Sequence, residues 1–104
     1  MNEMLRKTKA YSIVIFKKGP NRDKPGAEKV IWEHGRRNFA LRAEGKLSIV
    51  CPITGTSEVK GLAIFNATTQ ETEKMMAVDP AVKAGVLTYE IHTCQSFPGD
   101  SLPK

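Results

Sequence analysis

The stretch Met75-Met-Ala-Val-Asp-Pro-Ala-Val-Lys-Ala-Gly-Val-Leu87 decides how the second half of the chain folds. Asp79-Pro80 is a favoured helix start, because the carboxylate accepts hydrogen bonds from free backbone N–H groups and proline suits the first helical position. Gly85 ends the short helical turn, and the alternation over residues 86–97 is typical of a strand. A capped turn therefore leads directly into the last strand.

Five further elements precede this stretch. Gly45 and Thr68 mark the clearest boundaries, since glycine commonly ends a helix and threonine commonly caps the start of one. Residues 17–27 are dense in glycine and proline and predict a long mobile loop. In chain order, the periodicity predicts a strand at 8–17, a helix at 27–44, strands at 47–52 and 59–66, and a helix at 70–78.

This order predicts a single domain over residues 1–104. A β-α-β-β-α-β sequence with a hairpin in the middle is typical of the ferredoxin-like plait. We therefore expect an α+β fold in which one four-stranded antiparallel sheet carries helices on one face. The core spans about residues 9–97, with a basic N-terminal extension before it and an irregular C-terminal tail after it.

The middle strands have apolar side chains on both faces. Leu62 and Ile64 alternate with Ala63 and Phe65. Helices cover only one face of such a sheet, so a lone chain would expose the other apolar face to water. We expect a homodimer that packs sheet on sheet, and the pattern leaves open whether dimers assemble further.

The composition is that of a soluble globular protein, with 40% hydrophobic and 26% charged residues among 104. No apolar run approaches the about 20 residues needed to cross a membrane, and the N-terminus has no apolar stretch of the signal-peptide type. We therefore expect a cytoplasmic protein. In that compartment Cys51 and Cys94 are expected to be reduced, half-buried thiols.

The positive charge is concentrated in the first half of the chain. Residues 1–46 contain 12 Lys and Arg against 5 Asp and Glu, whereas residues 47–104 contain 4 against 6. This asymmetry is compatible with a nucleic-acid partner, with steering of a small anionic substrate, or with an ordinary solvated surface. Nucleic acid is the least supported partner, because aromatic residues make up only 7% and no basic stripe with interleaved aromatics occurs.

His34 and Asp79 are the candidate catalytic residues. At about 100° per residue, His34 lies near the centre of one apolar face of its helix, which is equally the place for a core histidine with satisfied hydrogen bonds. As a functional group it would be a general base, since imidazole titrates near neutral pH. Asp79 is explained by capping alone, but one carboxylate oxygen can cap while the other orients the imidazole and stabilises the imidazolium.

Three further residues are candidates for binding a substrate. Arg37 lies closest in helical angle to His34, and arginine suits bidentate contact with a carboxylate or phenolate, although a solvated helix face explains it as well. Asn38 lies one turn after His34 and is placed to hydrogen-bond a ligand. His92 alternates onto the face that carries Glu90 and Cys94, where it lines the space between two sheets or forms a polar part of a dimer interface.

Several chemistries lack their motifs. The chain has no phosphate-binding glycine loop, no Gly-x-Ser-x-Gly and no Cys-x-x-Cys. Its two His and two Cys lack the close spacing of zinc ligands. We therefore expect no metal and no cofactor.

Four motifs together resemble the YCII-related family: His34-x10-Gly45-Lys-Leu, Cys51-Pro52-Ile, Gly61-x3-Phe65 and Asp79-Pro80-x-Val-x-Ala-Gly85-Val. The resemblance covers roughly residues 9–97 and implies a dimeric α+β barrel, the fold class that includes muconolactone isomerase. It also implies that His34 and Asp79 are the histidine and aspartate proposed as the active-site pair of that family. One characterised branch is a dehydrochlorinase acting on a chlorinated hydroxyquinone.

The chain departs from the family pattern in two places. It has a longer, basic N-terminal extension and first loop, and its helix continues after the histidine with Gly35 and Arg36-Arg37 where an apolar continuation is more usual. The shape of the pocket is therefore not implied by the resemblance, whereas the His34 and Asp79 pair is retained.

These observations predict a small cofactor-free enzyme of the lyase or isomerase type. His34 and Asp79 would transfer a proton on a small enolic or ring substrate, which the basic first half of the chain suggests is anionic. The alternative is a non-catalytic module that binds a small ligand or an interaction partner.

Overall fold

The computed structural model describes residues 7–104, so most of the predicted N-terminal extension lies outside the described residues. The elements follow the predicted order. They are β1 (Lys9–Lys18), α2 (Ala27–Ala43), β2 (Leu47–Pro52), β3 (Val59–Phe65), α3 (Thr69–Ala77), α4 (Pro80–Lys83) and β4 (Leu87–Ser96).

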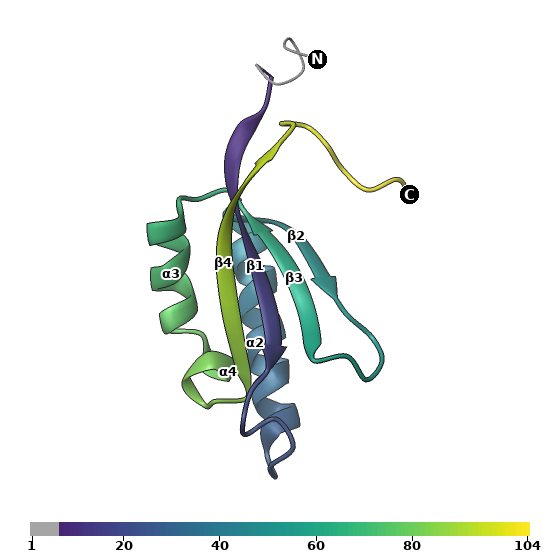
Figure 1. The fold of residues 1–104 in the computed structure, drawn as a ribbon, viewed down its shortest axis with the longest axis vertical. Coiled ribbons are helices and arrows are strands. Elements are labelled where there is room, and N and C mark those ends of the chain that lie inside the picture. The colour runs from purple at the N-terminus through teal and green to yellow at the C-terminus, as the bar shows by residue number, and fades with distance from the viewer. Residues whose placement is uncertain (1–6) are drawn as a thin grey trace.

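The four strands form one antiparallel sheet in the order β2-β3-β1-β4. The long helix α2 runs behind this sheet, and α3 stands beside β4 (Figure 1). The predicted α+β class and antiparallel four-stranded sheet are therefore confirmed, and the arrangement is consistent with the ferredoxin-like plait.

The core lies between the helices and one face of the sheet. Val14 pairs with Ala63 on one side and with Ile91 on the other, which places these side chains on the covered face. Phe65 and Met76 are fully buried there. Full burial of one such apolar side chain stabilises a fold by about 1.5–3 kcal/mol. The alternating side chains of β1 and β3 that point to the covered face therefore form the core.

The helix ends agree with the predicted boundaries because their capping residues act as expected. Gly45 adopts a φ of 80° after α2, and its N–H donates to the carbonyl of Arg42 at 3.0 Å. Thr68 caps α3, since its hydroxyl accepts from the N–H of Glu71 while the Glu71 carboxylate accepts from the N–H of Thr68. Such a capping box stabilises a helix start by about 1 kcal/mol.

The loop between β1 and α2 is fastened to the turn before β4. The N–H of Gly19 donates to the carbonyl of Val86 at 3.0 Å, and the N–H of Asn21 donates to the carbonyl of Gly85 at 2.9 Å. The Asn21 side chain adds a third bond, from Nδ2 to the carbonyl of Ala84 at 2.8 Å. A side chain at Gly19 would not fit, because its Cβ would lie 2.3 Å from the Gly85 carbonyl oxygen.

Within residues 7–104, no helix covers the other face of the sheet. Tyr11, Ile13 and Ile15 point to this face from β1 and are half-buried, as are Leu62 and Ile64, which lie beside them on β3.

The two cysteines were expected to be half-buried. This is correct for Cys94, whereas Cys51 is exposed. Within residues 7–104, no helix combines the length and apolar character that a membrane crossing requires.

Candidate functional site

His34 and Asp79 lie in hydrogen-bond contact. The Nδ1 atom of His34, on α2, is 2.7 Å from Oδ2 of Asp79, the residue that caps α4. The Asp79 side chain is fully buried, and that of His34 is 12% exposed. Because an ionised carboxylate can only accept, the proton of a neutral His34 imidazole lies on Nδ1 and leaves Nε2 with a free lone pair.

Asp79 uses its two oxygens for two purposes. Its Oδ1 accepts from the N–H of Ala81 at 2.9 Å and from the N–H of Val82 at 3.4 Å, which starts α4. Its Oδ2 accepts from His34. Asp79 can therefore cap α4 and orient His34 at the same time, because a different oxygen makes each set of contacts.

The carboxyl of Asp79 is held in its charged form. Burial raises the pKa of Asp79, but the hydrogen bond and charge of His34, together with the backbone N–H groups of Ala81 and Val82, outweigh burial and lower the pKa below its ordinary value.

Arg37 contacts the same carboxylate. Its Nη1 lies 3.3 Å from Oδ2 of Asp79. Arg37 does not line the cavity that opens beside His34, which is described below. The helical angle predicts Arg37 beside His34, and both side chains contact Oδ2 of Asp79. The Arg37 guanidinium nevertheless meets Asp79 rather than open space, and its contact with a substrate stays a prediction.

Asn38 contacts the second nitrogen of the imidazole. Its Nδ2 lies 3.2 Å from Nε2 of His34, so the amide donates to the free lone pair. Asn38 is 5% exposed, and its Oδ1 is buried with no hydrogen-bond partner among the described residues. A buried acceptor left unpaired costs about 1–3 kcal/mol, and such a group in a native structure calls for an explanation.

A cavity of about 380 Å³ opens beside His34 and Asn38, between α2 and the β2–β3 hairpin. Its walls are mostly apolar, and the ring of Phe16 meets the imidazole edge to face with centroids 5.0 Å apart. Small-molecule sites in proteins are of this kind, apolar with a few polar groups that fix orientation. Two cationic residues also line it, Arg22 from the first loop and Lys60 from β3.

Sequence patterns gave no signal for Arg22 or Lys60. Arg22 lies in a loop without periodicity, and Lys60 is one of many surface-type lysines. His92, by contrast, was predicted from the sequence as a site residue but lies away from the cavity. It occupies the predicted sheet face, but this is the face away from α2, where it is exposed and lies 3.4 Å from a Glu90 oxygen. Within one chain His92 is therefore not brought to His34.

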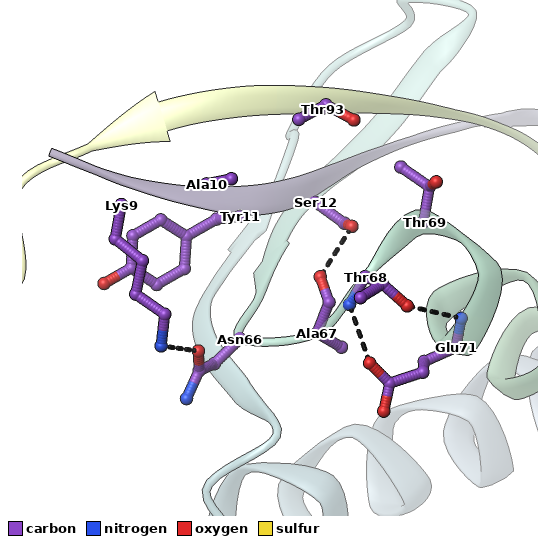
Figure 2. Close-up of a pocket in the computed structure, with 10 residues that line it drawn as sticks. All are labelled: Lys9, Ala10, Tyr11, Ser12, Asn66, Ala67, Thr68, Thr69, Glu71 and Thr93. Atoms are coloured by element: carbon purple, nitrogen blue, oxygen red, sulfur yellow. Dashed lines mark hydrogen bonds between the residues drawn. The ribbon is translucent and has the colours of Figure 1, made fainter.

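A second hollow, of about 440 Å³, lies at the start of β1 (Figure 2). Most of its polar side chains already bond one another or the backbone. Lys9 donates to Asn66, and the hydroxyl of Ser12 donates to the carbonyl of Ala67. The capping bonds of Thr68 occupy the remaining corner. This hollow offers a ligand few unsatisfied groups, unlike the cavity beside His34.

Comparison with known proteins finds no protein-family model and no curated protein that matches this chain. The YCII-related resemblance therefore stays a prediction. Within residues 7–104, no three His, Cys, Asp or Glu side chains gather where they could hold a metal ion.

Proposed function

We propose that this protein is a small cofactor-free enzyme of the lyase or isomerase type that transfers a proton on a small enolic or ring substrate. The observation that carries the proposal is the 2.7 Å contact between His34 and a fully buried, charged Asp79 at the edge of an apolar cavity. A general base needs an accepting atom within reach of the substrate and a partner that holds its tautomer.

In the proposed reaction, Nε2 of His34 removes a proton from a substrate C–H group next to a carbonyl. The electron pair of that bond moves into the carbonyl and forms an enolate. Asp79 stabilises the imidazolium formed at the same time. An isomerase returns the proton to another carbon of the enolate, whereas a lyase expels a leaving group as the electron pair moves on.

Asn38 must yield its place for this step, because its amide occupies the lone pair of Nε2 in the free protein. A substrate hydroxyl that donates to Nε2 would release Asn38. The freed amide can then turn toward the substrate, whose donors suit the unpaired Oδ1.

The proposal includes a homodimer of the dimeric α+β barrel type and membership of the YCII-related family. The bare sheet face supports the dimer, since Ile13, Ile15, Leu62 and Ile64 form a contiguous apolar surface with aligned strand register. Packing two such faces together removes from water an area that a monomer would leave exposed.

The test is exchange of carbon-bound hydrogen in D₂O, followed by NMR, over a panel of small enols, lactones, hydroxyquinones and aromatic acids. We expect one compound class to exchange catalytically with wild type and to lose this exchange in His34→Gln. The matched control is His92→Gln, which removes the other histidine from the opposite face of the same chain. Loss in both variants, or in neither, contradicts the proposed role of His34.

The cavity also fits the alternative, a module that binds a small ligand without reaction. A thermal-shift screen of the same panel separates the two functions. A ligand at 100 times its dissociation constant adds about 2.7 kcal/mol of stability. Ligand shifts without any hydrogen exchange would favour the binding module over the enzyme.

A further inference from the structure

We propose that Arg22 and Lys60 form an anion-recognising end of the cavity beside His34, and that the ligand is a small ring compound carrying one carboxylate. This inference rests on the proposed function, in which a hydroxyl or enol of the ligand meets His34. It adds a carboxylate on the same ligand, which Arg22 and Lys60 would bind. It names the specificity residues, which come from the loop before α2 and from β3.

The charge of the cavity supports an anion. Arg22 and Lys60 both line it, and none of its lining residues is an Asp or Glu. Among residues 7–104, neither cation lies within ion-pair distance of a carboxylate. Lys18 chiefly, and Arg22 and Lys60 to a smaller extent, lower the pKa of the exposed Asp23 carboxyl, so both cations interact with this carboxylate without forming an ion pair with it. Two cations lining apolar walls still raise the local potential, which favours a negatively charged ligand.

Arg22 also has an unmet hydrogen bond. Its Nε is buried and has no hydrogen-bond partner among the described residues. A buried N–H without a partner costs free energy until something accepts from it. A carboxylate suits this position, because guanidinium and carboxylate form paired, charge-assisted bonds.

The loop that carries Arg22 is held in place. On either side of it, Gly19 and Asn21 donate to the backbone of residues 85–86, and Lys18 pairs with Asp23 at 2.7 Å. A fixed loop positions its guanidinium at little entropic cost when a ligand binds. This distinguishes Arg22 from Lys24, which is exposed on the same loop and does not line this cavity.

Arg22 and Lys60 line the same cavity as His34 and Asn38, and apolar side chains such as Phe16 and Ile31 form much of the rest of its wall. A ring with a carboxylate at one position and a hydroxyl across from it would satisfy both pairs of side chains. That hydroxyl would donate its one proton to Nε2 of His34, and the displaced Asn38 amide would donate to the hydroxyl oxygen.

The experiment measures binding of 4-hydroxybenzoate and of its neutral analogue, 4-hydroxybenzamide, by titration of amide NMR spectra. In wild type we expect the acid to bind more tightly and to shift resonances of residues around the cavity. Arg22→Gln is expected to weaken acid binding about tenfold, which corresponds to the loss of one charge-assisted contact. Binding of the amide should change little, and Lys60→Met should act as Arg22→Gln does.

Lys24→Gln is the matched control, since it removes one positive charge from the same loop and should leave acid binding within about twofold. Arg22→Lys should restore part of the affinity if charge matters and the fold is intact. Equal affinity for acid and amide, an equal effect of Arg22→Gln and Lys24→Gln, or no acid binding at millimolar concentration would each overturn the inference.

The titration measures binding and not catalysis, so the anion site and the enzyme function can fail separately. Arg22-dependent binding of the acid with no hydrogen exchange would sink the enzyme and keep the anion site. Hydrogen exchange that depends on His34, together with equal affinity for the acid and the amide, would keep the enzyme and sink the anion site.

Discussion

Oδ2 of Asp79 lies 2.7 Å from Nδ1 of His34, although 45 residues separate the two in the chain. The same carboxylate starts α4 through its other oxygen, so one buried side chain sets both the start of a helix and the orientation of an imidazole. Its substitution therefore has separable consequences for structure and for protonation.

Asp79→Asn should reverse the tautomer of His34. Asparagine is as good a helix cap as aspartate, so its oxygen is expected to keep the N–H groups of Ala81 and Val82 and to turn its NH₂ toward Nδ1. Nδ1 must then accept, and the proton moves to Nε2. Imidazole ¹⁵N spectra at neutral pH should show Nδ1–H in wild type and Nε2–H in the variant.

Glu90→Gln is the control for this change. Glu90 lies beside His92 on the bare sheet face, so its substitution should leave the His34 signals in place. A variant Asp79→Asn that keeps Nδ1–H would show that the carboxylate does not set the tautomer. We also expect Asp79→Asn to cost about 1–3 kcal/mol of stability, because a charged buried acceptor is lost.

Asp79 should also contribute to acid unfolding. Its pKa is lowered in the folded chain from the ordinary 3.8, so its contribution to stability is fully present above that value and is lost as pH falls through the folded pKa. Urea unfolding between pH 6 and the most acidic accessible pH should show wild type losing stability below about pH 4. The loss should be smaller in Asp79→Asn, and equal losses would contradict the lowered pKa.

Two glycines should respond oppositely to alanine. At Gly19 the added methyl meets the Gly85 carbonyl oxygen, so Gly19→Ala should cost about 1–3 kcal/mol and loosen the loop that carries Arg22. At Gly35, inside α2, a methyl meets nothing within 4 Å, so Gly35→Ala should stabilise by about 0.5–1 kcal/mol. Urea unfolding measures both, and destabilisation by Gly35→Ala would mean that the space beside His34 is occupied.

Local rules sufficed for the elements of the fold. Gly45, Thr68 and Asp79 act as caps at the predicted positions, and the predicted helix and strand boundaries lie within two residues of the observed ones. Caps and alternation depend on near neighbours in the chain, which a sequence displays directly.

The site was only partly predictable, because its contacts cross between elements. His34 and Asp79 were singled out, yet the positions of Arg37 and His92 depend on how α2 and β4 lie against the sheet. Helical angle alone does not say that Arg37 meets Asp79. Arg22 reaches the cavity through a docked loop, whose path is set by backbone bonds to residues 84–86 that no sequence pattern announces.

Tyr89 should ionise late. The hydrogen bond that its hydroxyl donates to Glu73 on α3, together with burial, raises the pKa of Tyr89 to about 12. A raised folded pKa means that the contact contributes stability below the ordinary value of 10.0 and loses it as pH climbs toward 12. Absorbance titration near 295 nm, compared with Tyr89→Phe, should assign the late component to this residue. Glu73→Gln should shift it to lower pH, and an unchanged midpoint would rule out the contact with α3.

The proposed homodimer should depend on the bare face of the sheet. Ile13 lies at its centre, opposite Ile64 on β3 and His92 on β4. Ile13→Lys places a charge where two sheets would meet, and an unpaired buried charge costs several kcal/mol. We expect light scattering after size exclusion to give a dimer mass for wild type and a monomer mass for the variant.

Val78→Lys is the control for this prediction. Val78 is 59% exposed at the end of α3, away from that face, so the substitution should leave the dimer intact. A wild-type monomer, or equal dissociation of both variants, would refute sheet-on-sheet pairing. Dissociation confined to Ile13→Lys would place the interface on β1 and its neighbours, and would bring His92 of each chain into it.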